Sequence, residues 1–173
     1  MKKIMFALVV LFSLVSLTSG AQSTEELVKE WERAKAYTKE YLDAMPESGY
    51  SLKPTPEMRS FAEQMLHLTD GNYGFASAVS GEKSPLTERA EKTADKSKAN
   101  VTKMVMDGYD YVINTIKKVK PEQLKETTKV FGQFEMTKGT ALAKLFEHQT
   151  HHRGQTTVYL RLAKATPPNE KLF

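Results

Sequence analysis

Histidine is scarce in this chain, and three of its four copies fall within five residues. These are His148, His151 and His152. On a helix, His148 and His152 lie four residues apart, so both rings leave the same face one turn apart. Two neutral imidazoles placed in this way can bind one divalent ion, and a third would complete a site with an open coordination position. The spacing therefore predicts part of a three-histidine metal site.

The remaining histidine, His67, lies far upstream in another segment and is the candidate third ligand. His151 is displaced around the helix from His152, so we expect it at the rim of the site. The spacing alone leaves a second interpretation open. In that interpretation the distal histidines form a solvated patch, and His67 is a hydrogen-bonded core residue.

Four segments with apolar residues at helical spacing must position these side chains. They cover roughly residues 24–45, 55–80, 85–120 and 137–165. Ser23 is the expected N-cap of the first helix, and the charged run 88–98 is expected on a solvated face of the third. Residues 121–136 form a longer connection, with 130–134 extended. The pattern predicts an all-α four-helix bundle with a longer connection before the last helix.

Residues 1–21 have the order of a secretory signal, with two lysines, an apolar run and then small residues. We expect cleavage between Ala21 and Gln22, which leaves one domain over 22–173, no membrane span and a periplasmic or secreted protein. The alternative is that the segment stays as an anchor, although its apolar run is short for one.

Composition excludes several function classes. The net charge of +4 falls to about +2 without Lys2 and Lys3, which is too weak to indicate a nucleic-acid partner. The chain has no cysteine, so disulfides, thiolate ligands, a cysteine nucleophile and covalently attached haem are all excluded.

Three sequence segments together resemble the DinB-like superfamily. They are the run His148-Gln-Thr-His-His-Arg-Gly-Gln followed by Pro167-Pro168, the upstream segment from Pro56 to His67-Leu, and the first segment with Trp31. The resemblance implies a four-helix bundle of DinB type, commonly a homodimer, with a divalent ion on His67, His148 and His152. Zinc and nickel are the expected metals.

The resemblance also implies a range of activities. Its members include thiol-dependent S-transferases and an isomerase, so we expect a metal-dependent transferase, isomerase or hydrolase acting on an unidentified small molecule. Export would separate the protein from cytosolic thiols and weakens the transferase interpretation. A non-catalytic metal-binding protein is the alternative, and a b-type haem bundle is a weaker one.

Three residues near the histidines are candidates for a catalytic role. Glu63 lies one helical turn before His67, Asp70 lies three residues after it, and Tyr159 shares the face of His152. The competing interpretations are solvated carboxylates and a tyrosine packed in the core. Gln155 is expected to support the ligands from nearby.

Overall fold

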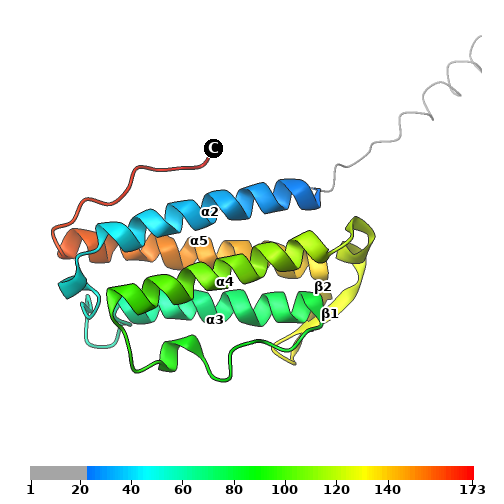
Figure 1. The fold of residues 1–173 in the computed structure, drawn as a ribbon, viewed down its shortest axis with the longest axis horizontal. Coiled ribbons are helices and arrows are strands. Elements are labelled where there is room, and N and C mark those ends of the chain that lie inside the picture. Colours follow the sequence, from blue (N-terminus) through cyan, green and yellow to red (C-terminus); the bar gives the residue numbers. More distant parts are fainter. Residues whose placement is uncertain (1–22) are drawn as a thin grey trace, which may run out of the picture.

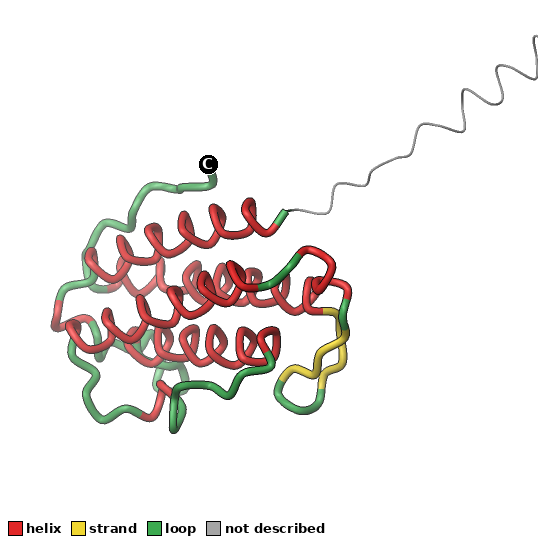
Figure 2. The backbone as a smooth tube through the Cα atoms, turned by 45° about the vertical axis from the view of Figure 1, so that its right-hand side comes forward, coloured by secondary structure: helices red, strands yellow, loops and turns green. Residues whose placement is uncertain are grey.

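The computed structural model describes residues 23–173, and four long helices pack side by side within them (Figures 1 and 2). The helices are α2 (Thr24–Ala44), α3 (Phe61–Ser80), α4 (Lys98–Lys118) and α5 (Lys138–Leu162). Around the bundle the order is α2, α4, α3 and α5, so α3 and α5 are direct neighbours. The predicted all-α four-helix bundle is confirmed.

Side-chain caps determine where the helices begin. Ser23 caps α2 as predicted, because its hydroxyl accepts the N–H of Glu26 at 3.1 Å. The prediction that the second helix begins near residue 55 is wrong. Ser60 caps α3 through the N–H of Glu63, and the N–H of Phe61 donates instead to the carbonyl of Leu52 at 3.1 Å. The residues before Ser60 therefore form a turn that leads into α3.

The prediction of a helix over residues 85–97 is also wrong. This segment is a loop with a short 3-10 turn, Ala90–Lys92, and α4 begins only at Lys98. The carboxylate of Asp70 on α3 accepts the N–H of Ala90 at 2.6 Å and that of Glu91 at 3.2 Å. These bonds fasten the loop to α3. Its charged residues therefore form tertiary contacts and not one face of a helix.

The connection before α5 contains a β-hairpin that the sequence indicated only as an extended stretch. Strands β1 (Thr127–Val130) and β2 (Phe134–Thr137) pair in antiparallel register, with Val130 opposite Phe134. The Thr128 hydroxyl donates to the carbonyl of Ala78 at 2.5 Å, which connects the hairpin to α3. Figure 2 draws the hairpin in yellow. The turn between the strands therefore lies against the bundle.

The core between the helices is rich in aromatic side chains. Trp31 is fully buried and contacts Phe146 edge-on and Tyr109 at a tilt. Arg153 is buried in the same core. Its guanidinium donates to the Gln149 side chain at 3.1 Å and stacks 4.4 Å from the centre of the Tyr37 ring.

None of the helices described over residues 23–173 is long and apolar enough to cross a bilayer. The predicted signal peptide, residues 1–21, lies outside the described residues and stays a prediction.

Residues 82–97, which connect α3 to α4, are called the 82–97 loop. Replacing Asp70 with Asn tests the attachment of this loop to α3. In Asp70 each carboxylate oxygen accepts one backbone N–H, whereas the amide of asparagine has only one oxygen. One N–H therefore loses its acceptor, and we expect a loss of about 1–3 kcal/mol in the free energy of unfolding. Hydrogen exchange at the Ala90 and Glu91 amides should accelerate. Asp107→Asn is the control, because this exposed carboxylate only pairs with Lys103 and should matter by less than about 1 kcal/mol. Equal effects of the two substitutions would contradict the assignment.

Candidate metal centre

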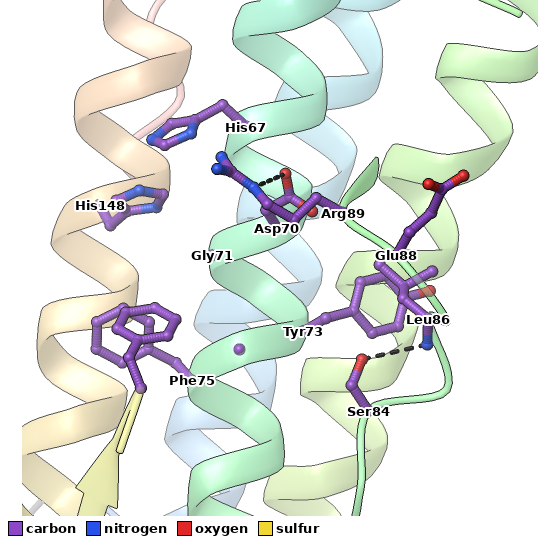
Figure 3. Close-up of a pocket in the computed structure, with 12 residues that line it drawn as sticks. His67, Asp70, Gly71, Tyr73, Phe75, Ser84, Leu86, Glu88, Arg89 and His148 are labelled. Atoms are coloured by element: carbon purple, nitrogen blue, oxygen red, sulfur yellow. Dashed lines mark hydrogen bonds and ion pairs between the residues drawn. The ribbon is translucent and has the colours of Figure 1, made fainter. Parts of the chain in front are cut away.

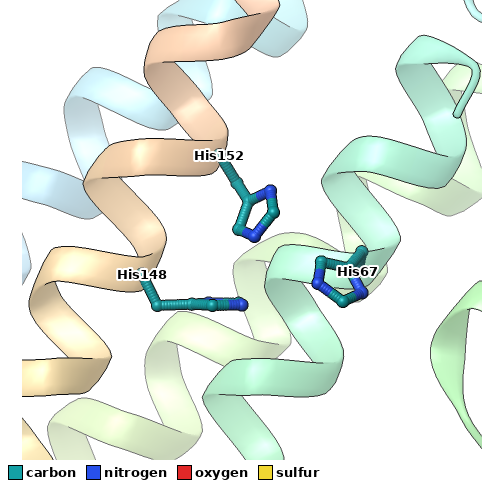
Figure 4. A group of neighbouring side chains, drawn as sticks. All are labelled: His67, His148 and His152. Carbon is teal, nitrogen blue, oxygen red and sulfur yellow. The ribbon is translucent and has the colours of Figure 1, made fainter. Parts of the chain in front are cut away.

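Three imidazoles converge between α3 and α5 (Figure 4). His67 comes from the middle of α3, and His148 and His152 come from successive turns of α5. Each ring offers one nitrogen, and these three nitrogens lie within 4.8 Å of one another. His151 stays outside this cluster, where its Nε2 lies 3.0 Å from the Gln155 side chain. The structure thus brings together the three histidines that the sequence singled out.

Gly71 makes room for this arrangement on α3. A Cβ atom at this position would lie 2.6 Å from Nδ1 of His148, well inside contact distance. α3 continues through Gly71 without interruption, so the glycine permits close approach and does not mark a break in the helix. The close approach therefore brings the α5 histidines within reach of His67.

The three histidines are electrically neutral near neutral pH. Burial, the neighbouring rings and Arg59 lower the pKa of His148 to about 4. Burial, His148 and His67 lower the pKa of His152 to about 3. Burial and the charge of Arg59 likewise lower the pKa of His67. Neutral imidazole is the form that binds metals, so protons do not compete with an ion at this cluster near pH 7.

The cluster also contains buried polar atoms that the described residues leave without hydrogen bonds. Nδ1 of His67 and Nδ1 of His148 are two such atoms. Most buried polar groups in proteins are paired, and the lone pairs of neutral imidazole nitrogens attract a cation. A divalent ion fits this donor set, because it accepts one lone pair from each ring.

Supporting groups surround the histidines. The Glu91 carboxylate lies 3.4 Å from Nδ1 of His67 and faces this neutral ring. Nδ1 of His152 lies 2.8 Å from the Gln64 amide, which also contacts Gln155 as the sequence suggested for that residue. Carboxylates and amides in such positions orient metal-binding imidazoles.

Glu91 and Gln64 are the residues that sequence reasoning missed. Glu91 accepts from Arg59 at 2.6 Å and from Arg89 at 2.7 Å. Burial alone would raise its pKa, but these guanidinium groups and His67 outweigh that effect and hold the pKa below its usual value. Glu91 therefore stays charged beside His67. Gln64 precedes His67 by three residues, and this spacing was the one signal available for it.

The candidate catalytic residues occupy positions with structural contacts. Glu63 completes the capping box of α3, and this contact with Ser60 lowers its pKa despite partial burial. Asp70 holds the 82–97 loop. The Tyr159 hydroxyl donates to the carbonyl of Arg59 at 2.8 Å, inside the protein. Among these residues and Glu91, it is Glu91 whose carboxylate lies against a histidine of the cluster.

A cavity of about 660 Å³ opens beside His67 and His148 (Figure 3). Its lining is largely apolar and comes from α3, from the 82–97 loop and from the hairpin turn. The apolar lining residues include Gly71, Gly74, Phe75, Leu86 and Phe131. A small molecule in this cavity therefore reaches the nitrogens of the cluster from one side.

The fold and the cluster define a class of protein: a four-helix bundle with three converging histidines from two helices beside an open cavity. The sequence model of the DinB family matches residues 20–172, so the chain belongs to the DinB family. This finding confirms the resemblance seen in the histidine motifs.

Individual proteins are similar to this chain in sequence or in fold. The uncharacterized protein YjoA of Bacillus subtilis is 24% identical over 143 residues, which cover 80% of this chain and 89% of YjoA. A DinB-like protein from Bacillus cereus superposes with a TM-score of 0.75 at 20% identity, over 87% of this chain and 99% of that chain. YfiT from Bacillus subtilis, described as a probable metal-dependent hydrolase with an unusual four-helix bundle topology, gives a TM-score of 0.64 at 15% identity. That superposition covers 86% of this chain and 91% of YfiT.

Substituting Gly71 with Ala tests the approach of His148. The new methyl group overlaps the imidazole, so we expect the ring to move and zinc affinity to fall at least about tenfold, which is about 1.4 kcal/mol. Gly154→Ala on α5 is the matched control. Its Cβ would meet nothing within 4 Å, and alanine should stabilise the helix by up to about 1 kcal/mol. Zinc titration by calorimetry compares the two, and an unchanged affinity in Gly71→Ala would refute the role of this glycine.

The lowered histidine pKa values predict how the metal-free protein responds to acid. Below about pH 6.5 the unfolded chain takes up protons at these histidines, whereas the folded chain resists until about 4 at His148 and about 3 at His152. The contribution of these histidines to the free energy of unfolding is thus fully present above pH 6.5, and it is lost as the pH falls toward 4.

Thermal melts in chelator from pH 7.5 to 4.5 should show a falling melting temperature. The double variant His148→Asn, His152→Asn should have a shallower dependence. The same slope in both proteins would show that these histidines do not govern the acid response.

Proposed function

We propose that this chain is a divalent-metal-dependent hydrolase whose ion is bound by His67, His148 and His152. The observation that carries the proposal is the convergence of three neutral imidazoles, two of which, His67 and His148, line an open cavity. A divalent ion held by three imidazoles supplies Lewis-acid chemistry at its open coordination position. Zinc and nickel suit such a donor set.

The surrounding residues have distinct parts in this proposal. Glu91 orients His67 through its Nδ1 side, and Gln64 does the same for His152. Gly71 lets His148 approach α3. The apolar walls of the cavity limit the water around a bound substrate, which strengthens polar interactions with its reacting group.

Two considerations favour hydrolysis over transfer or isomerisation. YfiT, which shares this fold, is described as a probable metal-dependent hydrolase. Hydrolysis needs only water as the second reactant, whereas thiol transfer needs a small thiol that an exported protein would not meet. The predicted export of the chain therefore agrees with a hydrolytic reaction.

A non-catalytic metal-binding protein is the second candidate, and one observation favours it. The nearby carboxylates are already engaged: Glu91 with Arg59 and Arg89, and Asp70 with the loop backbone. Neither carboxylate is free to act as a base. In the non-catalytic candidate the ion has a structural role and joins α3 to α5. The haem alternative is disfavoured, because the three rings contact one another with centroids 4.4 to 5.4 Å apart and leave no slot for a porphyrin between them.

Metal analysis of purified variants tests the site directly. We expect one zinc or nickel ion per wild-type chain, and less than about a tenth of that in His67→Ala, His148→Ala or His152→Ala. His151→Ala is the matched control on the same helix and should retain the ion. Saturating metal at about one hundred times its dissociation constant should stabilise the wild type by about 2.7 kcal/mol. Full retention in the three cluster variants would disprove the site.

Turnover separates the two candidates. The metal-loaded protein should hydrolyse at least one member of a panel of chromogenic esters, amides and phosphate esters. Chelation should abolish this activity, and added zinc or nickel should restore it. A metal-loaded protein that binds its ion through all three histidines but hydrolyses none of the panel would favour the non-catalytic candidate.

A further inference from the structure

The cavity beside the histidines is shaped by two glycines and two aromatic rings. Gly71 and Gly74 both line the cavity and lie about one turn apart on α3. Each leaves room for a ring where a Cβ would stand, His148 at Gly71 and Phe131 at Gly74. Figure 3 shows the cavity beside Gly71. The rings of Phe75 and Phe131 meet edge to face on one side, with centroids 5.1 Å apart. Leu86 lines the cavity from the 82–97 loop. The volume of about 660 Å³ is in the range of sites that enclose small organic molecules.

The charges around the cavity do not favour an anionic ligand. Arg89 is the one lysine or arginine among the described residues that line it. Its guanidinium already pairs with Glu91 at 2.7 Å and with Asp70 at 3.4 Å. Glu88 adds a further carboxylate to the lining. A ligand bearing a carboxylate or phosphate would therefore find no free cation among these side chains.

Phe131 stands at the hairpin turn in a conformation that phenylalanine rarely adopts. Its φ is 52°, the following Gly132 has a φ of 71°, and the N–H of Gln133 donates to the carbonyl of Val130 at 3.1 Å. Hairpin turns with two consecutive positive φ values favour Asn and Gly. A non-glycine residue held there carries a steric cost, because its Cβ approaches the following carbonyl oxygen.

Burial in the core does not account for this cost, because Phe131 is 55% exposed. The ring instead lies directly over Gly74, where any Cβ would overlap it. Strained residues concentrate at ligand-binding sites, where their position matters more than their stability. Phe131 and Phe75 together form an aromatic wall of the cavity, and the centroid of the Phe75 ring lies 6.4 Å from that of His148.

We propose that this cavity binds the uncharged aromatic or apolar body of the substrate, with Phe131 as the residue that selects it. The substrate's polar, reacting end points toward His67 and His148. Only this orientation rests on the proposed metal site. Binding of the apolar body depends on Phe131, Phe75 and Leu86 alone and occurs without metal.

An uncharged fluorescent probe, N-phenyl-1-naphthylamine, tests the apolar wall in both metal-free and metal-loaded protein. The wild type should bind it, and Phe131→Asn should bind it about tenfold more weakly. Phe134→Asn is the matched control, since this neighbouring phenylalanine is 57% exposed and lies outside the cavity lining. It should bind like the wild type.

The melting temperature of Phe131→Asn should be equal to or above that of the wild type, because asparagine suits a positive φ. Phe131→Gly repeats the test if the first variant does not fold. An absence of binding in the wild type, or equal losses in the variants at 131 and 134, would overturn the proposal.

Hydroxamates then link the cavity to the metal in zinc-loaded protein. Benzohydroxamate should bind about tenfold more tightly than acetohydroxamate, and Phe131→Asn should reduce this preference to about threefold or less. 4-Carboxybenzohydroxamate should bind no more tightly than benzohydroxamate. If the naphthylamine binds but no hydroxamate does, the open metal site fails and the apolar cavity stands. Equal affinity for the two uncharged hydroxamates would refute the apolar proposal and leave the metal site intact.

Discussion

The close approach of three uncharged imidazoles between α3 and α5 is the constraint on which the rest of the structure depends. Burying polar rings against one another costs free energy unless their nitrogens find partners. The protein limits this cost by keeping the rings neutral, as the lowered pKa values of His148 and His152 show. It also requires a glycine at Gly71, because a larger residue would displace the His148 ring. Adjacent packing of α3 and α5 is therefore a requirement of the site as much as of the core.

Asp70 connects this constraint to the surrounding loop. The residue lies one turn after His67 on α3, yet its carboxylate points to the backbone of Ala90 and Glu91. By holding that backbone, Asp70 places the Glu91 side chain beside His67. Arg59 and Arg89 then keep Glu91 charged. Asp70, which the sequence offered as a catalytic candidate, thus has a positioning role in this structure, because it places the carboxylate of Glu91.

Local periodicity explains which features could be predicted from the sequence. The four-residue spacing of His148 and His152 places them on one face of any helix, and His67 was the remaining histidine. Glu91 could not be found in this way, because residues 85–97 are rich in charged residues that also suit a helix. Hydrogen bonds to Asp70, which lies about twenty residues earlier, determine the conformation of the segment around it. Phe131 likewise combines a positive φ with a ring packed over Gly74, and no short-range pattern predicts a phenylalanine there.

The site divides its tasks between rigid and irregular elements. All three histidines belong to long helices, so their geometry follows from the packing of the bundle. Much of the cavity wall comes instead from the 82–97 loop and the hairpin turn, through Leu86 and Phe131. Loops accept changes that would disrupt a helix interface. A bundle with this division can keep one histidine cluster while its loops shape different cavities. The likeness to YfiT therefore shows only the fold, and any substrate must be inferred from the residues of this chain's own loops.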